Sequence, residues 1–214
     1  YKRQDVYLRE GYSMSDVFTT GILQRGRDGK LVEEGNGYQV DRSQRIRLGS
    51  ADPDFTMGWR HDINYKNISL GLMITGRFGG IVTSQTQAFM DAFGVSKVSA
   101  EARDNGGVML DGHRYDAERY YNTVGGQGLM SYYTYDATNV RLQELSLTYS
   151  LPKKWLGDVF NNATISFVGR NLFMFYRKAP FDPDMNGSTG TYNRSDFFMA
   201  PSLRNLGFSI KFSL

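Results

Sequence analysis

The sequence contains no cysteine, which excludes a scaffold held by disulfides. Only two histidines are present, His61 and His113, so a zinc site is not expected. No run of about 18 apolar residues occurs, which excludes a membrane-spanning helix. The net charge of +3 is small beside 25 basic and 22 acidic residues. Without a basic stripe interleaved with aromatic residues, nucleic acid is not an expected partner.

The residues that are abundant favour an all-β chain. Aromatic residues make up 14% of the 214 positions, and 24 glycines stand against 5 prolines. The mean hydropathy of -0.45 is that of a water-soluble protein. A transmembrane β-barrel has a similar average, because half of each strand faces a polar lumen.

The last ten residues carry the clearest strand pattern. Large apolar side chains occupy every second position from Leu206 to Leu214, and small or polar ones lie between them. Because side chains alternate between the faces of a strand, this stretch has one apolar and one polar face. A transmembrane β-strand needs about 9–11 such residues. The sequence therefore predicts a strand at the end of the chain that fits a membrane barrel.

Similar alternation predicts the other strands. Lys66 and Asn67 separate two of them and predict a two-residue hairpin turn. Val140 and Leu142 are out of phase with the alternation that follows, which predicts a bulge near Gln143. With a weak first stretch we expect about seven strands; the well-patterned ones span residues 12–23, 54–65, 68–78, 140–151, 163–175 and 202–214.

Three long intervals without strand pattern are predicted to be external loops, at residues 24–53, 79–138 and 176–201. The first is expected to hold a short strand near residues 46–48, and the second two short helices, at 86–93 and 96–103. A tight turn at one end of a hairpin and a sixty-residue loop at the other is typical of outer-membrane barrels. Seven strands cannot close such a barrel, so we expect the C-terminal part of a larger one.

Several motifs resemble SusC/RagA-type TonB-dependent outer-membrane transporters. They cover residues 51–214 well and the first fifty loosely. They are ADPDF (51–55), YKN (65–67) with GRFGG (76–80), VRLQELSLTYSLPKKW (140–155), VGRNLF (168–173) and APFDPD (179–184). That family's signal peptide, TonB box, plug domain and earlier barrel strands have no counterpart here. We expect the chain to be a fragment or portion of a longer transporter, or one piece of a split transporter.

The resemblance implies a 22-stranded plugged barrel in the outer membrane of a Gram-negative bacterium. It implies TonB-dependent import of oligomeric nutrients, glycans or peptides. The expected partners are a SusD/RagB-like surface lipoprotein, the TonB complex acting through the missing N-terminal part, outer-membrane lipid and the substrate itself. No bond chemistry and no cofactor are expected. The substrate and the oligomeric state do not follow from the sequence.

Two groups of residues are candidates for contacts. Tyrosines of the second long loop are candidates for stacking on a substrate or a partner, with packing of the loop on itself as the alternative. They are Tyr115, Tyr120, Tyr121, Tyr132, Tyr133 and Tyr135. Charged residues on the polar side of the strands are predicted to face the lumen as a salt-bridged wall. They are Arg60, Asp62, Arg77, Glu144, Arg170 and Lys211.

Other patterns carry weaker hypotheses. The stretch from Asp182 to Gly187 imitates the start of a calcium loop, but its twelfth position is Asn193, where a bidentate Glu is needed. The pairs Asp52/Asp54 and Asp182/Asp184 could serve as glycosidase carboxylates. Aspartates that flank a proline in this way more often shape turns, which is the better interpretation.

Two other function classes stay open. A soluble all-β carbohydrate-binding module would place Phe55, Trp59 and Phe208 in a sandwich core. An outer-membrane barrel enzyme would need a nucleophile–base pair, and the two histidines support no triad. A requirement for detergent separates a barrel segment from a soluble module.

Overall fold

The computed structural model describes residues 4–6, 10–157, 160–184 and 195–213. The chain forms two compact units, each built from three separate intervals. The sheet unit comprises Pro53–Gly79, Ala137–Asp184 and Pro201–Leu214, and the loop unit comprises Tyr1–Asp52, Gly80–Asp136 and Met185–Ala200. The expected all-β class is confirmed, with long strands in the sheet unit and the α-helices of the described residues in the loop unit.

Among the described residues, none of the helices has both the length and the apolar character needed to cross a bilayer.

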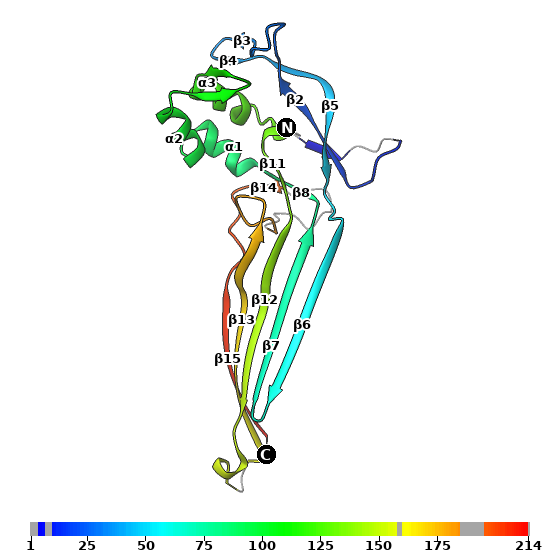
Figure 1. The fold of residues 1–214 in the computed structure, drawn as a ribbon, viewed down its shortest axis with the longest axis vertical. Coiled ribbons are helices and arrows are strands. Elements are labelled where there is room, and N and C mark those ends of the chain that lie inside the picture. The colour runs from blue at the N-terminus through cyan, green and yellow to red at the C-terminus, as the bar shows by residue number, and fades with distance from the viewer. Residues whose placement is uncertain (1–3, 7–9, 158–159, 185–194, 214) are drawn as a thin grey trace. The chain divides into compact units, whose positions relative to one another are not determined.

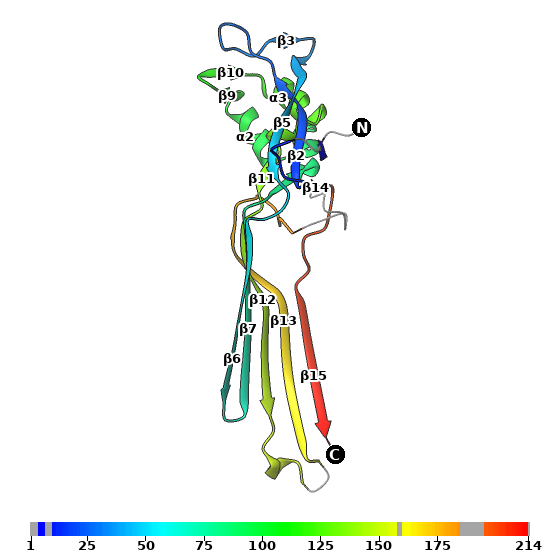
Figure 2. The same cartoon turned by 90° about the vertical axis from the view of Figure 1, so that its right-hand side faces the viewer.

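The sheet unit is a five-stranded antiparallel sheet in the order β15-β13-β12-β7-β6. Figures 1 and 2 show these long strands running side by side. They are β6 (Phe55–Tyr65), β7 (Ile68–Phe78), β12 (Asn139–Ser150), β13 (Asn162–Arg177) and β15 (Asn205–Ser213). A short 3₁₀ turn, η3 (Lys153–Trp155), follows β12. Five of the six predicted strands coincide with these elements.

Register puts the apolar side chains of all five strands on one face. Trp59 pairs with Ile74, Leu142 with Phe173, and Phe167 with Phe208. Since directly paired residues of antiparallel strands share a face, the alternation of each strand adds to one continuous apolar surface. His61 also lies on this face, with its ring stacked 5.5 Å from that of Trp59.

The two predicted irregularities of the sheet are confirmed. Tyr65 pairs directly with Ile68, so Lys66 and Asn67 form a two-residue turn, in which Lys66 has a φ of 52°. The register shifts between Leu142 and Glu144 against both neighbouring strands, which makes Gln143 the bulged residue. The bulge returns Val140 and Leu142 to the apolar face despite their phase in the sequence.

The loop unit is irregular and contains small sheets and helices. Its strands are β1 (Gln4–Val6), β2 (Asp16–Leu23), β3 (Glu33–Glu34), β4 (Gly37–Tyr38), β5 (Val40–Ser50), β8 (Ile81–Ser84), β9 (Val108–Leu110), β10 (His113–Tyr115), β11 (Thr134–Asp136) and β14 (Ser195–Asp196). Its helices are α1 (Gln85–Ala92), α2 (Lys97–Asp104), α3 (Ala117–Tyr121), the π-helix η1 (Asn122–Gly126) and the 3₁₀ helix η2 (Met130–Tyr132).

All three expected loops need correction. The interval 176–201 overlaps the end of β13 and contains the two-residue strand β14. The interval 24–53 contains β5, eleven residues long and paired with β2, where only a short strand near residues 46–48 was expected. Charged and polar residues dominate β5, so the alternation of apolar and polar side chains that predicts other strands is missing there. The interval 79–138 is likewise not free of strands, since it holds β8 to β11. Its two predicted helices are confirmed as α1 and α2, which begin after the capping residues Ser84 and Ser96.

The loop unit has its own hydrophobic core. Buried aliphatic residues such as Leu129, Met130 and Val124 pack there with tyrosines from the segment 115–133. Helix α1 contacts η1 at Gly125, where an added Cβ would collide with the backbone oxygen of Ala88. This close approach explains the need for glycine at that position.

Candidate functional site

All six residues of the predicted salt-bridged wall lie on the polar face of the sheet. On this face Glu144 lies directly opposite Arg170 in the neighbouring strand. Arg77 lies opposite Thr56 of β6. Lys211 pairs with Thr164 at the other side of the sheet. Whether this face borders a lumen stays a prediction.

Two ion pairs on this face are exposed. Arg60 Nε lies 2.9 Å from Asp62 Oδ2 on the same strand, and Arg170 Nε lies 2.9 Å from Glu144 Oε2 across strands. Exposed pairs of this kind contribute about 0.2–1 kcal/mol each, so they tune the polarity of the face more than its stability.

A third group of charges, the arginine–aspartate node, is buried. Arg141 Nη2 lies 2.8 Å from Asp182 Oδ1 and 2.6 Å from Asp184 Oδ2. The side chains of Arg141 and Asp182 are only 7% and 9% exposed, whereas that of Asp184 is 37% exposed. Arg77 Nη1 adds a longer contact of 3.8 Å to Asp184. The node therefore ties the turn at residues 181–184 to strands β7 and β12.

Asp182 also organises its own turn. Its Oδ1 accepts the backbone N–H of Asp184 at 3.1 Å, and its Oδ2 accepts that of Ser202 at 3.3 Å. Burial alone raises the pKa of Asp182, but these N–H donors and Arg141 outweigh it and hold the pKa below its usual value. The prediction of turn chemistry at Asp182 is confirmed. The partner Arg141 was missed, although its position between Val140 and Leu142 places it on the polar face.

The remaining acidic candidates have structural roles. The N–H of Asp52 donates to Ser50 Oγ at 3.2 Å, and the N–H of Asp54 donates to the carbonyl of Phe78 at 2.9 Å, where β6 begins beside the end of β7. In the described part of the chain, no group of three or more His, Cys, Asp or Glu side chains could hold a metal ion. The imitated calcium loop runs through residues 185–193, which lie outside the described residues.

The candidate tyrosines divide into two groups. Tyr115, Tyr120, Tyr121 and Tyr133 are buried in the core of the loop unit, and the Tyr115 hydroxyl accepts the N–H of Leu31 at 3.1 Å. Burial raises the pKa of Tyr121 and Tyr133. Burial argues against surface contacts for these four rings and favours packing of the loop on itself.

Tyr132 is exposed and Tyr135 is half-buried. Contact of these two rings with a substrate or a partner stays a prediction.

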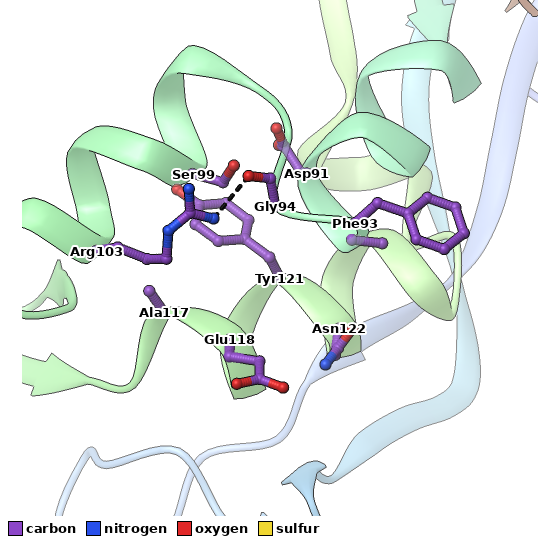
Figure 3. A pocket seen from close by; sticks show the side chains of 10 residues that line it. Asp91, Phe93, Gly94, Ser99, Arg103, Ala117, Glu118, Tyr121 and Asn122 are labelled. Carbon is purple, nitrogen blue, oxygen red and sulfur yellow. Dashed lines mark hydrogen bonds between the residues drawn. The ribbon is translucent and has the colours of Figure 1, made fainter.

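A pocket of about 310 Å³ in the loop unit was not predicted from the sequence (Figure 3). It lies among the end of α1, α2 and α3. Arg103 Nη1 donates to the carbonyl of Gly94 at 2.6 Å across it. The buried carboxylate of Asp91 accepts from Gln87 Nε2 at 2.8 Å. The other lining residues are Ala92, Phe93, Ser99, Ala117, Glu118, Tyr121 and Asn122.

Solved structures share this fold. The chain aligns over 99% of its length with 24% of a chain in the structure of the RagAB peptide importer in the 'open-open' state, with a TM-score of 0.62 and 15% identity. In the 'closed-closed' state the TM-score is 0.55 over 92% of this chain and 21% of the other, with 16% identity. At such identities the likeness shows the fold alone. The fold is that of a portion of a large β-barrel, and the total of 22 strands stays a prediction.

Two sequence relatives are named as TonB-dependent receptors. The chain is 29% identical over 239 residues to "TonB-dependent receptor P3" of Formosa agariphila, covering 99% of this chain and 23% of that protein. It is 26% identical over 189 residues to "TonB-dependent receptor P26" of the same organism, covering 83% and 18%. No family model matches the chain. The resemblance to SusC/RagA-type TonB-dependent receptors is confirmed, and the chain spans less than a quarter of the length of these relatives.

Proposed function

We propose that the chain forms barrel wall and external loops of a TonB-dependent transporter that imports oligomeric nutrients across the outer membrane of a Gram-negative bacterium. The observation that carries the proposal is the five-stranded sheet with one continuous apolar face and one polar, ion-paired face.

The apolar face is largely exposed. A water-soluble protein rarely exposes a contiguous apolar patch above a few hundred Å², because the hydrophobic effect favours its burial. In a bilayer, lipid tails contact such an apolar surface, so it does not need to pack against other protein. The exposed side chains on this face are Phe55, Met57, Trp59, Ile63, Tyr65, Ile68, Leu147, Phe167, Phe173, Tyr176, Leu206, Phe208, Ile210 and Phe212.

The strand lengths fit a bilayer. Strand β6 has eleven residues, and ten steps of about 3.4 Å give roughly 34 Å along the strand. A tilt of about 40° reduces this to a height of roughly 26 Å, close to the apolar band of about 25 Å that outer-membrane barrels expose. The sheet edges support a larger assembly, since within the described residues β6 pairs only with β7 and β15 only with β13. In lipid, both edges require further strands.

The polar face supports a role as lumen wall, because barrel interiors of this class are polar. Among its charged groups, Arg60 pairs with Asp62 and Glu144 pairs with Arg170, which supports a role as wall. We further propose that a SusD-like surface lipoprotein and the TonB complex act with the complete transporter. The substrate is an oligosaccharide or a peptide. The structurally similar RagAB protein is described as a peptide importer.

Uptake by intact cells tests the proposal. Cells that express the full-length transporter are offered fluorescently labelled oligosaccharides and oligopeptides, with and without a functional TonB system. Accumulation of one labelled class, lost when TonB is inactivated, is the expected result. A full-length protein that dissolves in water without detergent, or uptake that persists without TonB, contradicts the proposal.

A further inference from the structure

Another cavity, of about 200 Å³, lies in the sheet unit beside the arginine–aspartate node. Three arginines line it, Arg141, Arg177 and Arg204, together with one carboxylate, that of Asp182. The charge of Arg141 is already balanced in the node, because its guanidinium contacts both Asp182 and Asp184. The other two arginines therefore give the cavity an excess of positive charge.

Neither Arg177 nor Arg204 has a carboxylate partner among the described residues, where the ion pairs of arginine involve other side chains. Both residues are exposed. The stretch 185–194, which lies outside the described residues, contains no Asp or Glu and so has no carboxylate to offer. The two guanidinium groups are therefore available to an anion from outside this part of the chain.

The segment that leads to Arg204 is fixed at two points. The N–H of Ser202 donates to Asp182 Oδ2 at 3.3 Å, and Asn171 Nδ2 donates to the carbonyl of Leu203 at 3.3 Å. Asn171 lies in the bulged part of β13 with a φ of 52°, a left-handed conformation that asparagine adopts more readily than most residues. Bulges re-aim side chains and are common next to active sites. The backbone before Arg204 is thus held against β13.

The cavity lies at the end of the sheet where the long intervals 79–138 and 176–201 join it. Arg177 is the last residue of β13 and pairs with Asn139, the first residue of β12. Arg77 pairs with Asn139 from the other side, so both arginines share the polar face. In the proposed transporter this is the outer end of the lumen wall, where an incoming oligomer arrives.

The chemistry of the cavity suits an anionic group. Guanidinium forks donate two parallel hydrogen bonds to the oxygens of a carboxylate or a similar oxyanion. The apolar side chains of Leu172 and Met174 line the same cavity, and a lower local dielectric strengthens charge-assisted hydrogen bonds. Pockets for whole small molecules take about 300–1,000 Å³, so a cavity of about 200 Å³ fits one charged unit of a longer chain.

We propose that Arg177 and Arg204 form an anion subsite, which binds a carboxylate or sulfate group of the transported oligomer. This inference rests on the proposed function and narrows its substrate class to anionic chains. Arg141 is a positioning residue in this arrangement, because it pairs with the Asp182 carboxylate that holds Ser202.

Binding of labelled oligomers to the full-length transporter in detergent tests the inference. Three pairs of probes have equal chain length and differ in charge. They are tetragalacturonate with its methyl ester, sulfated with unsulfated galactotetraose, and a tetra-aspartate with a tetra-asparagine peptide. The pair in which charge matters identifies carboxylate or sulfate, and sugar or peptide, as the source of the anion.

Arg177→Gln and Arg204→Gln each remove one positive charge of the subsite. Both side chains are exposed and without an ion pair among the described residues, so the melting temperature should be retained. Lys211→Gln is the matched control, because Lys211 is an exposed cation of the same polar face. It lies opposite Thr164, thirteen positions from Arg177 along β13. That separation is roughly 40 Å, several times the Debye length of about 10 Å.

At least one anionic probe should bind the wild-type protein about tenfold more tightly than its neutral counterpart, as expected for a charge-assisted hydrogen bond. Each Arg variant should raise the Kd of that anionic probe about tenfold and leave the Kd of the neutral one within about twofold. Lys211→Gln should leave both values within about twofold, because its charge is screened at that distance.

Three results overturn the inference. The first is a wild-type protein that binds no anionic probe more tightly than its neutral counterpart, or that binds none of the probes. The second is a preference for charge that survives both Arg variants. The third is an equal loss in all three variants, which assigns the preference to the overall potential of the lumen. TonB-dependent uptake of any labelled oligomer, neutral ones included, leaves the proposed function intact in each case, and its absence contradicts that function separately.

Discussion

Arg141→Met tests the buried charge of the sheet unit most directly. The substitution keeps an unbranched apolar stem but leaves the carboxylates of Asp182 and Asp184 without their guanidinium, which lies 2.8 and 2.6 Å away. Removing one partner of a buried ion pair costs about 3–5 kcal/mol. Because Asp184 is 37% exposed, solvent screens part of that charge, and we expect the low end, about 3 kcal/mol.

The loss should appear first in the turn that the node holds. The backbone amides of Asp184 and Ser202 donate to the Asp182 carboxylate, so their hydrogen exchange reports on the turn. In the full-length transporter in detergent, Arg141→Met should speed this exchange by about two orders of magnitude, since 1.4 kcal/mol corresponds to a factor of ten. The control Arg170→Met breaks an exposed pair on the same face and should change exchange less than about fivefold.

Two outcomes would refute this reasoning. Unaltered exchange of the Asp184 and Ser202 amides in Arg141→Met would mean that the turn does not depend on the ion pair. Equal effects of Arg141→Met and Arg170→Met would mean that burial does not strengthen the node. Adding Asp182→Asn to Arg141→Met should recover part of the loss, because no unpaired charge is then left deeply buried.

The same node predicts a dependence on pH. The folded pKa of Asp182 lies below its unfolded value, despite burial, because of its donors and Arg141. Its contribution to stability is therefore complete above about pH 4, near the unfolded pKa of aspartate. It is lost as the pH falls further through the folded pKa. Protection of the Ser202 amide should stay constant from pH 7 to about 4 and then decline, and a decline already between pH 7 and 5 would argue against this assignment.

Three further substitutions test other parts of the structure. Leu72→Arg on the apolar face should reduce the heat-modifiable folded fraction in outer membranes, at a cost of about 2–4 kcal/mol near the bilayer centre, whereas Ser146→Arg on the polar face, where Ser146 pairs with Gly71 and Val168, should not; equal losses would mean that the faces are misassigned. Tyr115→Phe removes the acceptor of a buried N–H and should destabilise the loop unit by about 1–3 kcal/mol in thermal unfolding, so an unchanged midpoint speaks against that bond. Gly79→Ala should cost more than Gly112→Ala although both have positive φ, because a Cβ at Gly79 meets a carboxylate and one at Gly112 meets open space; similar unfolding midpoints would contradict the clash.

The strands of the sheet unit could be predicted because apolar and polar side chains alternate along them. Leu206 to Phe212 and Phe55 to Tyr65 carry an apolar side chain at nearly every second position, and one face needs lipid or a core. The bulge at Gln143 could be predicted for the same reason, as a break in phase. Strand β5 could not be, because its side chains are charged on both faces and its pairing with β2 depends on the backbone.

Only part of the candidate site could be predicted from the sequence. The polar wall follows from alternation, which the sequence displays directly. The Arg141 node depends on a contact between β12 and a turn 41 residues away, and such long-range pairing leaves no local pattern. The tyrosines were noticed because they are abundant in one loop. Abundance alone does not show whether tyrosine rings lie on a binding surface or in a hydrophobic core. The structure buries four of the six, which pack with Leu129, Met130 and Val124 in the core of the loop unit.

In the proposed transporter, the bulge near Gln143 limits how external loops can be exchanged. Between Leu142 and Glu144, β12 has one residue more than β7, and β13 has one more again between Phe173 and Arg170. A chimera joined on the membrane side of Glu144 carries these insertions along with the grafted loop. A junction placed between the insertions would combine strands of unequal length, shift the register by one residue and turn the following side chains to the opposite face.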